Sequence, residues 1–457
     1  FADKLMDLIE IPVVWIEQAT LQKGESTHFV VRGKGTPSDI SFESDLQIRW
    51  KCDTSDSEGH YSIQADLNME EVGEHDIGIA IDGKCTNIKL YCVPPLEDIA
   101  EKRVHFIVNK QQESGGNLDG AYLIYDKETD SRYYSHLNDH NGGRERVAMG
   151  ALIALWLQEH DDPIVKASLH KYVDYIYREL FDDKTGDVFN DIHRSNDWDR
   201  LYNYPWMSTF FMELFKSEGQ DKYLLDSCKA LRRYYEKDGI HFYGIGIQAA
   251  ELTGLLEMNG YESEAKEIRR LFLLHADYIK SAGLDFPKSE VNYEQSIVAP
   301  AVSISMQAYQ LTKNRDYLKT AEMFMNVLKL FNGHQPDYHL FENAIRHWDG
   351  YWFGKNRCFG DTFPHYWSVL TGTEYLRYAR LAENITEDFP YEKRGRASLR
   401  GCLSLFFCDG SASCAMVYPA SVNGKKAHYY DPWANDQDWA LYYALKYGIL
   451  QRQVKEF

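Results

Sequence analysis

The chain has 457 residues, of which 44% are hydrophobic and 26% charged, and its formal net charge at pH 7 is −19. At ~150 residues per domain this length predicts two or three globular domains, and no apolar run is long enough to cross a bilayer. Because nucleic acids and anionic membranes are held mainly through Lys and Arg contacts to phosphate, so negative a chain excludes nucleic acid as a partner.

The sequence says less about the cellular compartment of the protein and about its disulfide bonds. The chain begins at Phe1 without Met, so its first residues do not show whether a signal peptide has been removed. The eight cysteines are too sparse for a disulfide scaffold and contain no CxxC pair of the metal-binding kind. We expect mostly free thiols. If the compartment is oxidising, the candidate disulfides are Cys85–Cys92 and a bond from Cys52 to either of these two cysteines.

The first part of the chain alternates apolar and polar residues with the period of β-strands, and Gly, Asp, Ser and Pro clusters separate the runs. Short strands at this spacing predict an antiparallel sandwich of immunoglobulin-like type over residues 1–95, closed by Pro94-Pro95. The expected strands are Thr27–Val31, Leu46–Trp50, His60–Ala65, Ile77–Ile81 and Ile88–Cys92.

From about residue 97 the apolar residues recur with the period of helices. Short connections at 158–162, 259–260 and 313–315 predict antiparallel helical hairpins. The expected helices are 146–156, 164–176, 209–215, 223–235, 244–258, 263–279, 297–311, 317–330, 365–382 and 399–407, with a further start at 439–443.

The hairpins recur too irregularly for an open solenoid of the tetratricopeptide kind, whose repeats run ~34 residues. Long aromatic-rich loops fall between hairpins rather than within them, which favours a closed ring whose inner helices surround a loop-rimmed cavity. The predicted fold class is therefore mainly α: an (α/α) toroid over residues 96–457, preceded by the small antiparallel β-sandwich.

The most unusual segment runs from Asn343 to Lys355 and continues at Gly360–Trp367. It mixes flat aromatic side chains with titratable groups and turn-forming glycines, a combination that suits a hydroxyl-rich ligand such as a sugar better than a helix core. We expect it to form the rim of an active site. Its candidate residues are Arg346, His347, Trp348, Asp349, Tyr351, Trp352, Asp361, His365 and Tyr366.

Four further segments have the same character, at 140–146, 198–206, 292–295 and 430–439, each at or just before an expected helix start. A helix cap explains Asp or Asn at any single one of them. Caps do not need Trp, Tyr, His and Arg alongside, and exposed aromatic clusters are costly unless they bind something. These segments add His140, Arg146, Trp198, Arg200, Tyr202, Trp206, Asn292, Tyr293 and Glu294 to the expected sugar site.

Individual roles stay open at this point. His347 and His365 are either proton-transfer groups or buried core histidines, and the arginines either clamp a carboxylate or form ion pairs. Glu294, Asp349 and Asp361 are candidates for a glycosidase acid and base, whose carboxyls stand ~5 to 9.5 Å apart.

Other chemistries have little support in the sequence. Residues 435–438 resemble part of a calcium loop but lack the glycine and distant glutamate of an EF-hand, so a helix cap is favoured there. No GxSxG, GxxxxGK[ST] or HExxH motif supports serine hydrolase, nucleotide or zincin chemistry.

A small β-sandwich followed by a helical toroid with Trp, Tyr, His and Arg in its loops resembles the six-hairpin carbohydrate-active enzymes, glycosidases and polysaccharide lyases with (α/α) barrels. Within that group, Arg346-His-Trp-Asp-Gly-Tyr-Trp352 with Gly360-Asp-Thr-Phe-Pro-His-Tyr-Trp367 looks like polysaccharide lyase family 27, which releases rhamnose capping glucuronic acid in arabinogalactan side chains.

The resemblance implies β-elimination at a uronide, in which a cation binds the C6 carboxylate, a base takes the C5 proton and an acid protonates the departing O4. Arg200 or Arg346 would bind the carboxylate, and Tyr202, His347, His365 or Tyr366 would move protons. It also implies a secreted, periplasmic or cell-surface bacterial-type protein with no cofactor, apart from a possible structural calcium. The alternatives are a six-hairpin glycoside hydrolase with a carboxylate pair and a non-catalytic glycan-binding protein.

Overall fold

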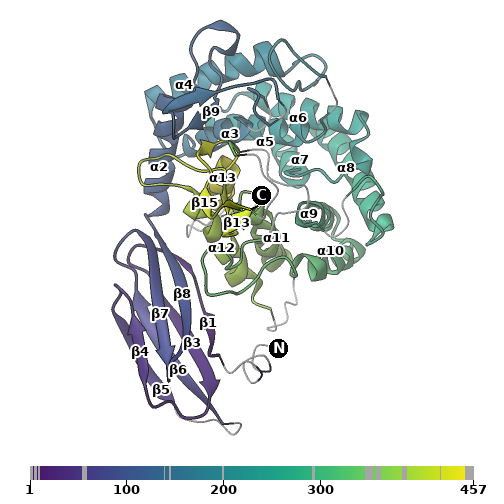
Figure 1. Cartoon of the computed structure of the whole chain (residues 1–457). Helices are drawn as coiled ribbons and strands as arrows, with labels where there is room; N and C mark the ends of the chain where they lie inside the picture. Colours follow the sequence, from purple (N-terminus) through teal and green to yellow (C-terminus); the bar gives the residue numbers. More distant parts are fainter. Residues whose placement is uncertain are drawn as a thin grey trace.

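The structure is a computed structural model that describes residues 4, 8, 11–53, 59–137, 139–143, 146–197, 200–290, 294–344, 354–356, 362–382, 389–422 and 424–447. Within this part of the chain, a β-sandwich precedes a ring of helices. Figure 1 shows the sandwich at the lower left and the ring at the upper right. The fold is therefore mainly α, with an (α/α) toroid that follows a small sandwich, as predicted.

Two four-stranded sheets form the sandwich, in the orders β1-β3-β6-β5 and β2-β8-β7-β4. Alternate residues of each long strand point inward, so that Phe29, Ile63, Ile77 and Ile88 are fully buried between the sheets. One neighbouring pair, β2 with β8, is parallel, which departs from the all-antiparallel expectation. The strands are β1 (Val13–Ile16), β2 (Thr20–Gln22), β3 (Ser26–Lys34), β4 (Ile40–Glu43), β5 (Ile48–Asp53), β6 (His60–Asn68), β7 (Gly73–Ile81) and β8 (Lys84–Val93).

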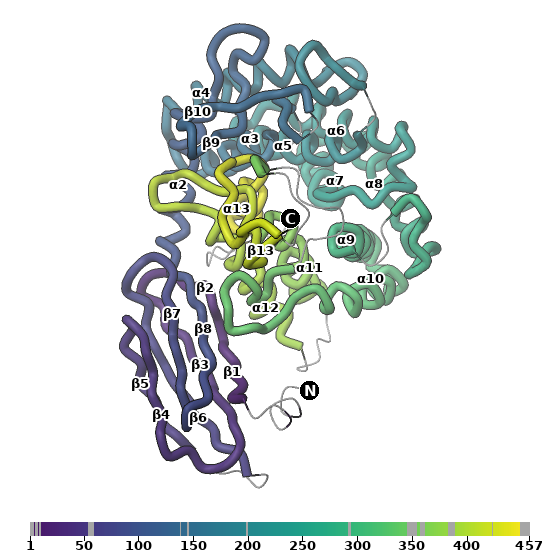
Figure 2. Tube along the Cα trace, in the orientation of Figure 1, coloured from purple at the N-terminus to yellow at the C-terminus, as the bar shows by residue number. Residues whose placement is uncertain are grey.

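The toroid begins at α2 and alternates between outer and inner helices (Figure 2). The outer helices are α2 (Leu96–Phe106), α4 (Pro163–Tyr175), α6 (Asp221–Glu236), α8 (Glu262–Ala282), α10 (Arg315–Leu328) and α12 (Tyr391–Gly401). The inner helices are α3 (Val147–Trp156), α5 (Asn203–Glu218), α7 (Ala249–Met258), α9 (Gln295–Thr312), α11 (Ser368–Leu381) and α13 (Asp438–Tyr447). Helix α13 packs against both α11 and α3, which closes the ring.

The sequence explains which helices lie inside. Helix α3 is apolar on every side and almost wholly buried, whereas α6 and α10 carry a single apolar stripe toward the ring. Gly150 of α3 permits a close approach, because a Cβ there would lie 2.5 Å from the ring of Tyr172 and 2.8 Å from that of Phe210. Outer helices begin at ordinary caps, such as Asp162, whose carboxylate accepts the Ile164 and Val165 N–H groups of α4.

Short strands and helical turns occupy the connections. One small sheet joins β9 (Ile124–Asp126), β10 (Ser131–Tyr133) and β16 (Trp433–Ala434), a second joins β11 (Thr362–His365), β12 (Ala415–Val417) and β15 (Tyr429–Tyr430), and a third pairs β13 (Ser421–Val422) with β14 (Lys425–Lys426). The π-helical turns η1 (Ile107–Gln111) and η4 (Ile176–Leu180) extend α2 and α4. The 3-10 turns are η2 (Gly116–Leu118), η5 (Gly239–His241) and η6 (Cys402–Leu405).

Three expected helices differ at their ends. The helix expected at 399–407 corresponds to α12, which begins at Tyr391 and ends at Gly401. Charged residues at 392–396 interrupt the apolar pattern at its start, so periodicity did not predict this part as helical. The helix expected from His365 begins at Ser368, because His365 pairs with Ala415 in a strand. The helix expected from Gly244 begins at Ala249, after a loop in which Gly246 has a φ of 82°.

The seven described cysteines are free thiols. Cys85 and Cys92 lie on the same strand, β8, where seven residues of extended chain separate them by roughly 23 Å, far beyond the reach of a disulfide. That pairing is therefore wrong. Within the residues described, no helix combines the length and the apolar composition needed to span a membrane.

Segment 336–341 of the toroid docks on the sandwich. The Lys89 N–H donates to the Pro336 carbonyl at 2.9 Å, and the Tyr338 N–H donates to the Lys89 carbonyl at 3.0 Å. Tyr338 and Phe341 are buried in the same apolar cluster as the sandwich core. The sandwich therefore shares its core with a segment that belongs to the toroid.

Candidate active site at the mouth of the toroid

The inner helices all begin at the same end of the ring. Consecutive helices are antiparallel partners, so alternate helices run in parallel and the loops before α3, α5, α7, α9, α11 and α13 gather at one mouth. Each of the five unusual sequence segments lies just before or at the start of one of these helices. The free N–H groups of helix starts give this end a partial positive potential that favours anions.

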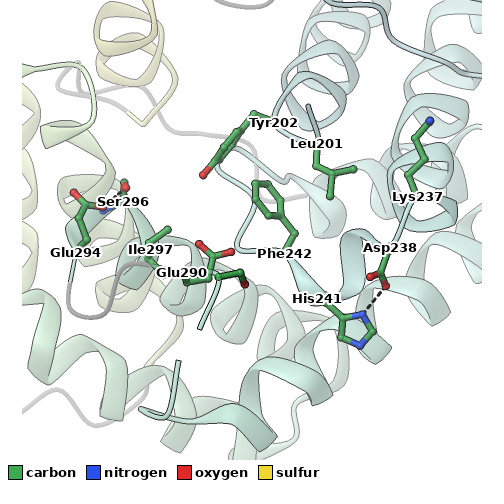
Figure 3. Close-up of a pocket in the computed structure, with 11 residues that line it drawn as sticks. Leu201, Tyr202, Lys237, Asp238, His241, Phe242, Glu290, Glu294, Ser296 and Ile297 are labelled. Carbon is green, nitrogen blue, oxygen red and sulfur yellow. Dashed lines mark hydrogen bonds and ion pairs between the residues drawn. The ribbon is translucent and has the colours of Figure 1, made fainter. Parts of the chain in front are cut away.

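A cavity of about 520 Å³ opens at this mouth, between the starts of α5 and α9 and the connection from α6 to α7 (Figure 3). Its walls combine two aromatic rings with acidic, basic and hydroxyl groups, which is the composition expected of a site for a polar, ring-shaped ligand. The lining residues are Leu201, Tyr202, Lys237, Asp238, His241, Phe242, Ser289, Glu290, Glu294, Ser296 and Ile297.

Tyr202, predicted as a proton-transfer residue, lines this cavity directly before α5. Its ring stacks on Trp206 at 6.1 Å between centroids and meets Phe242 edge-on at 4.6 Å. Two aromatic neighbours therefore hold the ring, while its hydroxyl points into the open space of the cavity (Figure 3).

Glu294, also predicted, lines the same cavity and caps α9. Its carboxylate accepts the Ser296 N–H at 2.7 Å and the Ser296 hydroxyl. A carboxylate at a helix start is stabilised in its charged form by these donors. Glu294 is thus 7% exposed and already engaged by its own helix.

His365, in the strand that precedes α11, pairs with Asp436. The imidazole Nε2 lies 3.3 Å from an Asp436 carboxylate oxygen, and Nδ1 is 3.2 Å from the Trp367 N–H that donates to it. Both side chains are buried, and Tyr366, equally buried, lies 4.7 Å from the imidazole between ring centroids. Gln295, the first residue of α9, donates to the Trp367 carbonyl at 2.9 Å, which ties this turn to the cavity wall.

His140 and Arg146 lie at another part of the mouth, before α3. His140 is 3% exposed and packs edge-on against Trp433 at 5.0 Å and Tyr133 at 5.8 Å. Arg146 is buried and donates from Nη2 to the Asp139 carbonyl at 3.2 Å. Neither lines the cavity of Figure 3.

Two further predicted residues, Arg200 before α5 and Trp206 within it, do not line the cavity as Tyr202 does. Trp206 is 3% exposed inside the ring, with its ring faces toward Tyr202 and Trp439. Arg200 is half-buried and its carbonyl accepts the Asn203 N–H at 3.1 Å. Neither side chain lines the described cavity.

The remaining predicted residues lie outside the described part of the chain: Arg346, His347, Trp348, Asp349, Tyr351, Trp352, Asp361, Trp198, Asn292 and Tyr293. Their expected roles stay predictions.

Sequence reasoning did not single out Lys237, Asp238, His241, Phe242, Ser289 and Glu290, which form half of the cavity wall. A signal was present, because they lie in the connections before α7 and α9, the same position relative to an inner helix as the segments that were singled out. His241 is exposed and pairs with Asp238 at 2.5 Å.

The residues at 435–438 have protein partners. Arg103 of α2 contacts both carboxylate oxygens of Asp438, at 2.6 and 2.8 Å, and Asp436 pairs with His365. Among the residues that the structure describes, no group of three or more His, Cys, Asp or Glu side chains is arranged to hold a metal ion. Residues 435–438 therefore link α13 to α2 and to β11.

No protein-family model matches the chain. No curated protein matches it either.

Solved structures do resemble it. A structure described as a polysaccharide lyase is 35% identical and superposes with a TM-score of 0.88, covering 97% of this chain. The chain spans 66% of that lyase's own length, just under two thirds. A family 76 glycoside hydrolase from a bovine Bacteroides thetaiotaomicron strain (10% identity, 95% of this chain, 99% of its own, TM-score 0.48) is also similar.

An unsaturated glucuronyl hydrolase mutant from Streptcoccus agalactiae is similar at 12% identity over 77% of this chain and 90% of its own, with a TM-score of 0.45. We draw no argument from similarity at this level. The lyase comparison covers almost the whole chain, and both the sandwich and the ring of hairpins are present. The resemblance to the six-hairpin (α/α)-barrel carbohydrate-active enzymes is thereby confirmed, and the chain is a relative of a polysaccharide lyase.

Proposed function

We propose that the chain is a polysaccharide lyase that cleaves at a glucuronic acid, one capped by rhamnose, by β-elimination. The observation that carries the proposal is the 35% identity to a polysaccharide lyase over 97% of the chain. The cavity at the mouth of the toroid supports it, because it joins aromatic walls with groups able to transfer protons.

The reaction needs three contributions: neutralisation of the uronate carboxylate, removal of the C5 proton and protonation of the departing O4. Tyr202 is the proton-transfer candidate whose hydroxyl faces the cavity. His365, which faces Asp436, and Tyr366, which packs against His365, stay candidates for proton transfer. Arg200 and Arg346 stay candidates for the carboxylate, and His347 for proton transfer.

The net charge of −19 favours a substrate with one terminal uronide over a long polyanion, which the protein as a whole would repel. We also propose that turnover needs no cofactor and takes place outside the cytoplasm. Dialysis against EDTA should leave turnover unchanged, while a fall in the melting temperature alone would reveal a structural calcium ion.

The test is incubation with rhamnosylated glucuronate oligosaccharides while the ultraviolet absorbance of an unsaturated uronide is followed. A lyase releases rhamnose and produces the chromophore in equal amounts. Release of sugar without the chromophore would overturn β-elimination, and no release from a panel of uronate-containing glycans would favour a non-catalytic binding protein.

A glycoside hydrolase is the second candidate, and one observation favours it. Glu290 and Glu294 line the same cavity, and their surroundings differ. Burial raises the pKa of Glu290, whereas Glu294 accepts hydrogen bonds from the Ser296 N–H and hydroxyl groups at the start of α9. Two carboxyl groups in different surroundings at one cavity are the pattern of a glycosidase acid and its partner. In that case Glu290→Gln, which cannot give up a proton, would abolish sugar release.

A further inference from the structure

Glu290 is a carboxyl in the cavity wall that forms no ion pair with any cationic side chain of the described residues. It lies in the connection between α8 and α9, half-buried, with its carboxylate directed toward the open space that Tyr202 also faces (Figure 3). The Tyr243 backbone N–H lies close enough to lower the pKa of this carboxyl, against the effect of burial. Among the described residues, no Lys, Arg or His forms an ion pair with it.

The other two carboxyls that line the described cavity are already engaged. Asp238 is paired with His241 at 2.5 Å, and Glu294 accepts two hydrogen bonds from Ser296. Glu290 is thus the described cavity carboxyl with the most capacity left to bind a ligand.

Among the described residues, the groups near Glu290 are mainly the phenols of tyrosine side chains. Burial raises the pKa values of Tyr234, Tyr243 and Tyr278, all of which stand near its carboxylate, so these rings are neutral at physiological pH. The Nζ atom of Lys237 lies 3.9 Å from an Asp187 carboxylate oxygen. In the part of the chain that the structure describes, the titratable and charged groups around this part of the cavity are Tyr202, Tyr234, Lys237, Asp238, His241, Tyr243, Tyr278 and Glu294.

A half-buried carboxyl without a cation favours its neutral form, because the charged form loses hydration and gains little in return. Burial accordingly raises the pKa of Glu290, and the Tyr243 N–H offsets this only in part. A neutral carboxyl can donate a hydrogen bond, which a carboxylate cannot.

We propose that Glu290, as a neutral acid, binds the carboxylate of the substrate by donating its O–H to one carboxylate oxygen across the cavity from Tyr202. The inference rests on the proposed uronide substrate and names the residue that recognises it. O–H···O⁻ bonds are short and roughly twice as strong as neutral ones. The shared proton stays between the two carboxyl groups while the C5 proton leaves to a base and O4 gains a proton, so Glu290 itself neither gains nor loses one.

A pH dependence follows with a definite sign. Glu290 is protonated below its raised pKa and becomes charged as pH rises through it. Two carboxylates then face each other and repel. Affinity for a uronate should therefore fall as pH rises, which is the reverse of what an arginine clamp would give, because arginine keeps its charge.

The test measures binding of methyl glucuronide and of neutral methyl glucoside to the full chain between pH 5 and 8, by calorimetry. We expect the wild-type protein to bind the glucuronide at least about tenfold more weakly at pH 8, a change of ~1.4 kcal/mol. Glu290→Ala should lose about tenfold or more in affinity at pH 5, since the donor is gone. Glu290→Gln keeps a donor and should bind with little dependence on pH.

Asp285→Asn is the matched control, since Asp285 is an exposed acid in the same connection that does not line the cavity. It should bind as the wild type does, and the glucoside should not distinguish any of these proteins. Wild-type affinity in Glu290→Ala, or a glucuronide affinity that rises with pH, would overturn the inference.

The unsaturated-uronide assay separates this inference from the proposed function. If the glucuronide binds as expected and no chromophore ever forms, the lyase fails and the role of Glu290 in binding stands. If the chromophore forms and Glu290→Ala binds and turns over as the wild type does, only the inference fails.

Discussion

At the scale of single residues, the proposed chemistry depends on side chains with restricted positions. Tyr202 is held by two aromatic rings, and His365 is buried with Asp436 at 3.3 Å from its Nε2. A histidine with one ring nitrogen facing a carboxylate and the other bonded to a backbone N–H has a restricted orientation. Such groups suit proton transfer because little reorganisation is needed when the substrate binds.

Tyr202→Phe and His365→Gln should each lower kcat by roughly 10²- to 10⁴-fold, the usual contribution of a positioned acid or base. The melting temperature should change little for Tyr202→Phe, because the ring that packs against Trp206 and Phe242 is kept. His170→Gln is the control, because His170 is a half-exposed residue that pairs with Glu218 on the outer surface. Unchanged kcat in a folded variant would remove that residue from the mechanism.

At the scale of elements, inner helices meet through buried charges as well as apolar contacts. Glu213 of α5 is fully buried and accepts from Lys446 Nζ at 2.8 Å and the Tyr442 hydroxyl at 2.7 Å, both on α13. Lys216 and Glu251 complete the cluster. Burial acts to raise the pKa of Glu213, but the two lysines outweigh it and hold the pKa below its usual range.

Lys446→Met should therefore destabilise the protein by about 3 to 5 kcal/mol at pH 7, because it leaves Glu213 and Glu251 buried with one cation fewer. A depressed pKa contributes stability above the unfolded value of ~4.3, and this contribution is lost as pH falls below it. The difference between wild type and variant should thus narrow in acid. Urea unfolding at pH 7 and pH 3.5 measures both effects.

The control for this cluster is Lys319→Met, which breaks an exposed pair with Asp316 and should cost less than ~1 kcal/mol. Equal losses in the two variants would contradict a special role for the buried cluster.

At the scale of the whole molecule, the sandwich and the toroid share a core at segment 336–341. Tyr338 is 1% exposed, and its hydroxyl donates to Glu74 of β7 at 2.6 Å. Arg400 of α12 adds a two-pronged ion pair with Glu25, at 2.6 and 2.9 Å. A shared apolar core of this kind favours unfolding in one step.

Calorimetry should accordingly show a single transition, although the expected boundary after residue 95 divides the chain into two domains. Tyr338→Phe should lower the free energy of unfolding in that single transition by about 1.5 to 3 kcal/mol, which is the usual contribution of a hydrogen bond to a charged group. Tyr133→Phe is the matched control on a partly exposed ring. Two transitions, of which the variant moves only one, would contradict the shared core.

Periodicity made the architecture predictable. Most inner and outer helices were expected within a few residues, since their apolar stripes are continuous and their caps are ordinary, as at Asp162 before α4. Errors arose where local pattern and tertiary pairing disagree: His365 belongs to a strand because β12 pairs with it, and the charged start of α12 shows no apolar period.

The sequence by itself determined the class of fold and the order of its parts, because burial patterns and residue types are local properties. It also located the mouth, since segments such as 198–206 and 292–295 precede inner helices. Only the tertiary structure decided which of those residues face one cavity. It joined Tyr202 and Glu294 to Glu290 and His241, which no sequence spacing relates, because the ring brings together chain segments that lie far apart.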